Sequence, residues 1–87
     1  MKLFILYHPE SESARKVEEF SHNFRRQTGE EVQFVSLETR DGSDLARLYD
    51  IVSYPAVLVR RDSGELLNSW QGDSLPLINE VAGYVWS

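Results

Sequence analysis

The residue types that carry out most protein chemistry are scarce in this chain, and cysteine is missing. Its 87 residues include no cysteine and two histidines. Disulfide bonds, thiol–disulfide exchange and cysteine zinc sites all need a thiol or thiolate, so the chain provides none of them. His8 and His22 do not stand at metal-ligand spacing from the carboxylates around them. We expect no metal site and no cofactor.

Serines at positions 11 and 13 follow His8 in a short polar segment. A serine hydroxyl stays protonated and weakly nucleophilic unless a base lies beside it. No serine, aspartate and histidine pattern typical of a hydrolase surrounds these residues. The free N–H groups at the start of a helix need acceptors, and serine is a preferred cap. We therefore predict that Ser11 or Ser13 caps a helix and that His8 is a surface side chain.

Asp73 and Ser74 form a second polar pair, between Gly72 and an apolar run. Such a pair commonly begins a helix. A helix N-terminus also attracts a carboxylate ligand. Both interpretations of the pair, a cap or part of a binding site, stay open.

The charge balance argues against nucleic acid as a partner. Fourteen acidic residues against nine basic ones give a net charge of −5, and an acidic surface repels phosphate backbones. The two basic pairs, Arg25-Arg26 and Arg60-Arg61, are expected to be solvated surface charges. The apolar run at residues 3–7 is too short for a signal-peptide core or a membrane span. We expect one soluble domain, residues 1–87, in the cytoplasm, with no membrane partner.

Four segments have the composition of strands. Residues 3–7 and 56–59 are continuous apolar runs, which are typical of strands covered on both faces. Residues 32–37 form another strand. Residues 65–71 return from the turn-forming segment 61–64 and complete a hairpin.

Three segments have the apolar spacing of helices. The first ends at Gly29 and should bury Ala14, Val17, Phe20 and Phe24. The second has Ser43 as a plausible cap and should bury Leu45, Leu48 and Tyr49. The third opens at residues 72–74 and should bury Leu75, Ile78, Val81, Ala82 and Val85. Trp86 is expected to close the end of the core.

The order of these segments predicts the topology. A helix connects the first two strands, so they should be parallel with a right-handed crossover. A tight turn connects the last two, so they should be antiparallel. The predicted fold class is α/β, a β-α-β-α-β-β-α chain with a four-stranded mixed sheet and helices on both faces.

The segment from Ala46 to Pro55, Ala-Arg-Leu-Tyr-Asp-Ile-Val-Ser-Tyr-Pro, resembles the approach of the thioredoxin family to its cis-proline. The family pattern is Ala-x-x-Tyr-x-Ile/Val-x-x-x-Pro, followed by an apolar strand, a glycine-containing turn and another strand. Asp62-Ser63-Gly64-Glu65 supplies the turn, and the order of elements matches over nearly the whole chain. The resemblance implies a thioredoxin-like fold and a cis peptide bond at Tyr54–Pro55.

The resemblance also implies where the family's redox residues would fall. Counted from the first strand, Ser11 takes the place of the nucleophilic cysteine and Ala14 that of the resolving cysteine. Ile5 takes the place of the buried carboxylate that assists proton transfer. The nucleophile, the resolving thiol and the proton acceptor are all replaced, so the resemblance implies a variant without oxidoreductase activity.

Our first hypothesis for function is a redox-inactive module that binds a protein or an extended peptide beside the proline. A loop at this place can pair its backbone with an extended ligand as a strand edge does, and this needs no cysteine. The binding residues would be Ser53, Tyr54 and Pro55, with His8 and Ser11 across the groove. Tyr54 is expected to be an exposed aromatic anchor.

Two alternatives stay open. Gly72-Asp73-Ser74-Leu75 resembles the segment that holds the γ-glutamyl end of glutathione in glutathione transferases and glutaredoxins, so Tyr54, Asp73 and Ser74 would bind glutathione or a similar small molecule. The other alternative is a purely structural, self-associating domain. Leu77 and Tyr84 are seven positions apart and would form a small patch, giving a monomer or a weak homodimer.

Overall fold

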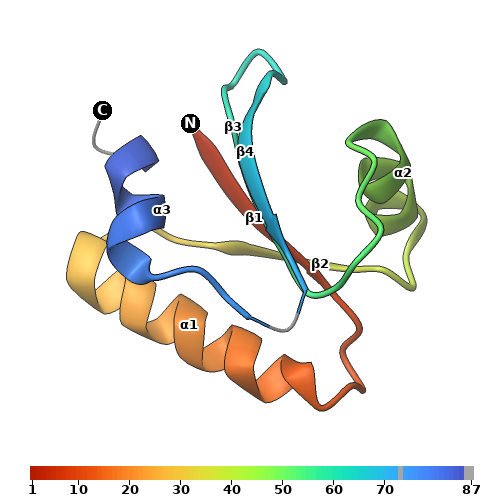
Figure 1. Ribbon diagram of the computed structural model, residues 1–87, viewed down its shortest axis with the longest axis horizontal. Coiled ribbons are helices and arrows are strands. Elements are labelled where there is room, and N and C mark those ends of the chain that lie inside the picture. The colour runs from red at the N-terminus through yellow and green to blue at the C-terminus, as the bar shows by residue number, and fades with distance from the viewer. Residues whose placement is uncertain (73, 86–87) are drawn as a thin grey trace.

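A computed structural model describes residues 1–72 and 74–85. In chain order these residues form β1 (Lys2–Tyr7), α1 (Ser13–Thr28), β2 (Gln33–Ser36), α2 (Arg40–Leu48), β3 (Ala56–Arg60), β4 (Leu66–Gln71) and α3 (Ile78–Val85). The strands make one sheet in the order β2-β1-β3-β4, with α1 and α3 on one side and α2 on the other (Figure 1). The predicted α/β fold class is confirmed. No described helix is long and apolar enough to cross a membrane.

Strand β1 lies inside the sheet and pairs with neighbours on both sides. It runs parallel to β2, with Ile5 opposite Phe34. It runs antiparallel to β3, with Ile5 opposite Val57. Strands β3 and β4 form the predicted antiparallel hairpin. The helical crossover accounts for the parallel pairing of β1 with β2, and the tight turn accounts for the antiparallel pairing of β3 with β4.

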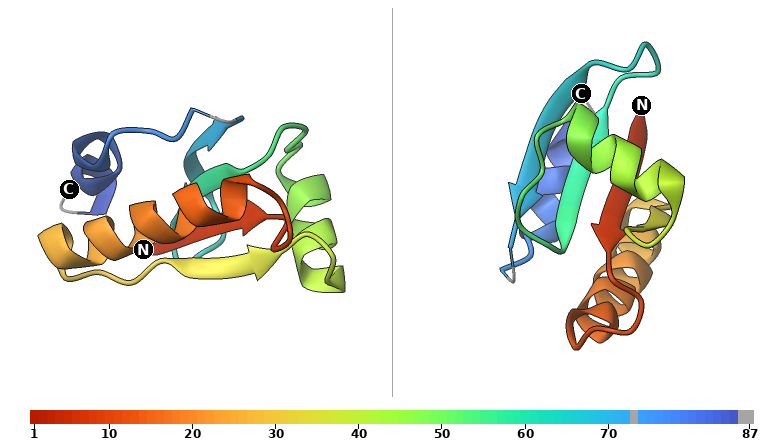
Figure 2. Two further views of the ribbon diagram at one scale, coloured as in Figure 1. Left: turned by 90° about the horizontal axis from the view of Figure 1, so that it is seen from below. Right: turned by 90° about the vertical axis from the view of Figure 1, so that its right-hand side faces the viewer.

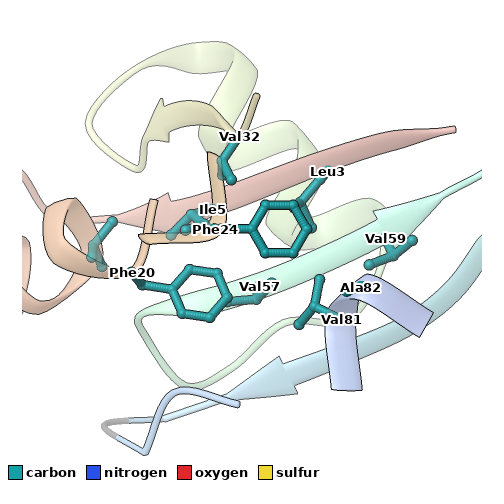
Figure 3. Close-up of a cluster of buried hydrophobic side chains, with 10 residues drawn as sticks. Leu3, Ile5, Phe20, Phe24, Val32, Val57, Val59, Val81 and Ala82 are labelled. Atoms are coloured by element: carbon teal, nitrogen blue, oxygen red, sulfur yellow. The ribbon is translucent and has the colours of Figure 1, made fainter. Parts of the chain in front are cut away.

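Alternate residues of β1 and β3 face two separate hydrophobic cores. The larger core lies between the sheet and helices α1 and α3 (Figure 3) and contains Leu3, Ile5, Val17, Phe20, Phe24, Val32, Val57, Val59, Val81 and Ala82. The smaller core lies between the sheet and α2 and contains Leu6, Ala46, Ile51, Ala56 and Leu58. Successive side chains of a strand point to opposite faces, so one continuous apolar run supplies both cores.

Helix α1 ends as predicted but begins differently. Gly29 closes it in the left-handed conformation, with φ 78°, and donates its N–H to the Arg25 carbonyl. Glu12 holds the N-cap position without a capping hydrogen bond from its side chain. The Ser11 hydroxyl donates to the His8 carbonyl at 2.7 Å and shares a hydrogen bond of 2.9 Å with the Ser13 hydroxyl. The predicted cap at Ser11 or Ser13 is therefore wrong, because these hydroxyls bind each other and the preceding loop.

Helix α2 begins earlier than predicted. Thr39 is its N-cap, and Thr39 Oγ1 accepts the N–H of Gly42 at 3.1 Å. Ser43 is exposed inside the helix, so its predicted role as the cap is wrong. Leu48, expected to face inward, is 66 % exposed. It points toward the edge of the sheet, where it lines a groove with β2 residues instead of joining the smaller core.

Gly42 fixes how closely α2 approaches the end of β2. A Cβ atom at this position would overlap the carbonyl oxygen of Ser36. The same carbonyl accepts hydrogen bonds from the hydroxyl and the N–H of Thr39, at 2.7 and 3.2 Å. The turn between β2 and α2 is therefore built around one carbonyl group.

Helix α3 begins later than predicted. It starts at Ile78, whereas the apolar spacing placed its first turn at residues 72–74. Pro76 gives the physical reason, because a residue before proline avoids the helical conformation, which keeps Leu75 out of the helix. Trp86, expected at the end of the core, lies outside the described residues.

Candidate functional site

The loop after β1 and the segment before β3, which both carry predicted site residues, lie at the same end of the sheet (Figure 1). His8 follows β1, and Tyr54 precedes β3. Their rings meet edge-on, with 5.7 Å between the centroids. Gly72, directly after β4, donates its N–H to the Pro55 carbonyl at 3.0 Å. The fold therefore brings the loop after β1 beside the Tyr54–Pro55 segment.

The three residues that the resemblance assigns to redox positions carry no reactive group. The Ser11 hydroxyl donates to a backbone carbonyl and not to a base. Ile5 is fully buried in the larger core, and Ala14 is half-buried. His22 is exposed in the middle of α1, several positions after Ser11 and Ala14 in the sequence. Within residues 1–72 and 74–85, no three His, Asp or Glu side chains gather in a way that would hold a metal ion.

The segment before β3 is held in a defined shape. The Tyr54–Pro55 peptide bond is cis, and Pro55 is buried. The Tyr54 hydroxyl donates to the Ile51 carbonyl at 3.0 Å, and the Tyr54 ring is half-buried against the smaller core. Tyr54 is therefore not the exposed anchor that was expected. The exposed apolar side chain of this segment is Val52, at 82 %.

Gln71 anchors the same segment, and sequence reasoning missed it. Its Oε1 accepts the N–H groups of Val52 at 3.0 Å and Ser53 at 3.2 Å. In the part of the chain that the structure describes, the backbone N–H and C=O of Tyr54 make no hydrogen bond. The one feature that could have indicated this role is the register of the hairpin, which places Gln71 opposite Ala56, at the start of β3 and close to this segment.

A groove of about 400 Å³ opens beside the His8–Tyr54 pair. Besides those two rings it is lined by Leu37, Ser43, Ala46, Arg47, Asp50, Ile51 and Val52. Its lining is mixed: apolar side chains stand beside polar ones, among them one basic and one acidic side chain. Asp50 has a φ of 54°, the left-handed conformation that turns the chain out of α2. Sequence reasoning had assigned none of the charged lining residues to the site.

The residues expected to bind glutathione are not arranged as predicted. Ser74 is exposed and precedes the first residue of α3, Ile78, by several positions. It therefore does not lie at a helix N-terminus, the feature that was expected to attract a carboxylate. Asp73 lies outside the described residues.

The two residues of the predicted self-association patch do not share a helix face. Leu77 is 66 % exposed and precedes α3. Tyr84 lies within α3, where its hydroxyl accepts a hydrogen bond of 3.0 Å from the Asn68 side chain. The Tyr84 ring also meets the Trp70 ring edge-on, at 5.8 Å between centroids. Tyr84 therefore packs α3 onto β4.

Comparison with known proteins finds the fold and not a close relative. Neither a protein-family model nor a curated protein sequence matches this chain. Thioredoxin 1 from Thermosipho africanus is similar with a TM-score of 0.68 over 99 % of this chain and 96 % of that chain, at 8 % identity. Mitochondrial thioredoxin 3 from Saccharomyces cerevisiae, in its oxidised form, is similar with a TM-score of 0.65 over 97 % of this chain and 74 % of that chain, at 13 % identity. The germline-specific thioredoxin Deadhead from Drosophila melanogaster gives 0.64 over 98 % and 79 %, at 16 % identity. The chain has a thioredoxin-like fold and contains no cysteine.

Proposed function

We propose that this thioredoxin-like domain is redox-inactive and binds an extended segment of a protein at the groove beside Tyr54 and Pro55. The absence of cysteine argues against thiol–disulfide chemistry. The observation that carries the binding proposal is the backbone of Tyr54 at the mouth of this groove, whose N–H and C=O make no hydrogen bond with any described residue. A free N–H and C=O on an extended segment are the groups with which a peptide pairs when it adds as a strand.

The hydrogen bonds of Gln71 define the register of such a ligand. Because the N–H groups of Val52 and Ser53 are already occupied, a peptide backbone pairs at Tyr54. Its next side chain then reaches the apolar wall formed by Ile51 and Val52. A loop fixed before binding loses little conformational freedom when the ligand arrives, which favours affinity.

The charged residues of the groove define the chemistry of the ligand. Arg47 and Asp50 both line the groove and are both exposed. Within the described residues neither forms an ion pair. A ligand with an apolar side chain between a basic and an acidic neighbour would complement this surface.

Exchange of Val52 for aspartate tests the groove. Partners captured from the native host with the immobilised wild-type domain would be identified, and their affinities measured by calorimetry. We expect Val52→Asp and Tyr54→Ala each to weaken binding at least about tenfold, because each removes apolar contact at the centre of the interface. Leu77→Asp is the matched control, since Leu77 is also exposed but lies on a different groove. Unchanged affinity of both groove variants, with native spectra, would contradict the proposal.

Glutathione is tested separately on the labelled wild-type protein. Amide shifts at Tyr54 and Ser74 at millimolar glutathione would favour the small-molecule alternative. We expect no shifts there, because Ser74 is not placed at the start of α3.

A further inference from the structure

A second and larger groove lies between the edge strand β2 and helix α2. Its volume is about 570 Å³. Its apolar lining includes Phe4, Val35, Leu45 and Leu48, and Phe34 borders it. Leu48 is 66 % exposed, so a large apolar side chain remains uncovered on this face. The Phe34 ring lies on the opposite face of the sheet, beside the Tyr7 ring. Figure 2 shows β2, in yellow, at the border of the sheet, with α2 beyond its end.

The helix side of this groove combines apolar and acidic residues. Asp41, Asp44, Leu45 and Leu48 all line it. Their spacing of three and four places them on one face of α2. Neither aspartate forms an ion pair with any residue that the structure describes. The groove therefore has an apolar floor and two uncompensated negative charges on its rim.

The strand side of the groove offers free backbone groups. Leu37 donates its N–H to the Tyr7 carbonyl at 2.9 Å, which shows the side from which β2 bonds to β1. Since successive residues of a strand direct their backbone groups to opposite sides, Gln33 and Val35 also face β1. The N–H and C=O of Phe34 and the N–H of Ser36 then point away from the sheet. Such an edge is a template for a further strand.

We infer that the edge of β2 binds an extended, cationic segment of another protein as an added strand. The backbone of the segment pairs with Phe34 and Ser36, an apolar side chain enters the groove, and lysine or arginine side chains lie beside Asp41 and Asp44. A second copy of this chain is the poorer occupant, because each copy carries a net charge of −5 and would add negative charge to an acidic rim. This interface is independent of the groove beside Tyr54.

The test uses a short, acetylated and amidated peptide, Lys-Thr-Val-Thr-Lys-Thr-Val, whose lysines and valines share one face of a strand, with the corresponding peptide that has glutamate in place of lysine as its charge-reversed control. Titrated into the ¹⁵N-labelled protein, the lysine peptide should shift the amides of residues 33–36 and 41–48. Raising the salt concentration should weaken its binding, since exposed charges are screened. Binding of the glutamate peptide with equal affinity, or shifts confined to residues 52–55, would overturn the inference.

Protein variants test how much the charges contribute to binding, and N-methylated peptides test the backbone pairing. The double variant Asp41→Asn/Asp44→Asn should bind the lysine peptide about threefold to tenfold more weakly, as two exposed ion pairs are lost. Glu18→Gln/Glu19→Gln makes the same charge change on the exposed face of α1 and should leave the affinity unchanged. Peptides N-methylated on all threonines, or on all lysines and valines, test the pairing, because an edge strand bonds to only one alternate set of N–H groups. One of the two should bind at least about tenfold more weakly, as its ladder hydrogen bonds are lost.

The remaining outcomes are also decisive. If both N-methylated peptides bind as well as the parent, strand addition is wrong. If the protein alone forms a dimer in sedimentation, and dilution shifts the amides of residues 33–36, a second copy occupies the edge and the cationic partner is wrong.

Discussion

Asp62 shows at the scale of a single residue how a contact changes a titration. The N-terminal ammonium donates a hydrogen bond to Asp62 Oδ1 at 3.0 Å. This hydrogen bond, and then the charge of the ammonium, lower the pKa of the Asp62 carboxyl below its ordinary value of 3.8. The charges of Lys2 and Arg60 act in the same direction.

The lowered pKa predicts the direction of a pH effect. A carboxyl with a depressed pKa in the folded state stabilises the protein above its ordinary pKa and loses that contribution as the pH falls through the folded value. Asp62→Asn should therefore lower the free energy of unfolding slightly at neutral pH. The difference from wild type should shrink as the pH falls below 3.8 and should vanish once the pH lies below the lowered pKa of the folded state. Urea unfolding at both pH values and NMR titration of the carboxyl carbon measure this, and a pKa at or above the ordinary value would contradict it.

Single residues also show what the sequence could and could not indicate about the site. His8 and Tyr54 were expected on opposite sides of one groove, and their rings are in contact. Gln71 was not expected, although it binds two N–H groups of the same segment. Its role depends on a side chain that reaches across a hairpin, and no local pattern of residue types encodes such a contact.

The boundaries of the elements depend on tertiary contacts as well as on local pattern. Thr39 and Ser43 are both chemically suited to cap α2. Thr39 is the cap because its hydroxyl and N–H also bind the Ser36 carbonyl, against which Gly42 packs. This arrangement appears only once β2 and α2 are in place, so the sequence alone could not choose between the two residues.

Substitution of the two residues distinguishes the caps. Thr39→Ala should lower the free energy of unfolding by about 1 kcal/mol, the usual cost of losing an N-cap acceptor. Ser43→Ala should change it by less than about 0.5 kcal/mol, because Ser43 is an exposed helical residue. Denaturant unfolding of both variants gives the comparison. An equal loss in the two variants would mean that the helix begins elsewhere.

At the scale of the whole molecule, the two cores carry the stability of the fold. The chain has no disulfide, since it has no cysteine. Continuous apolar runs at residues 3–7 and 56–59 predicted strands covered on both faces, and these runs supply both cores. The topology was predictable for this reason. The outward position of Leu48 was not, because the width of the sheet beneath α2 cannot be read from helical spacing.

Truncating one buried and one exposed apolar side chain measures how much each contributes to stability. Phe24 is fully buried in the larger core, so Phe24→Ala should destabilise the protein by about 3–5 kcal/mol. Leu48→Ala should cost less than about 0.5 kcal/mol, because Leu48 is 66 % exposed. Thermal and urea unfolding check both values. A large loss for Leu48→Ala would show that the groove between β2 and α2 is closed in solution.

Val52 is exposed, although the backbone of its segment is hydrogen-bonded to Gln71. This combination has a practical consequence for spectroscopy. Because the native chain has no thiol, Val52→Cys introduces a unique attachment point for an environment-sensitive fluorophore. The dye would stand at the rim of the groove beside Tyr54, while the backbone beneath it stays bonded to the glutamine. Leu48→Cys places the same dye at the other groove. Emission from these two single-label proteins would report, in one titration each, which groove a given partner enters.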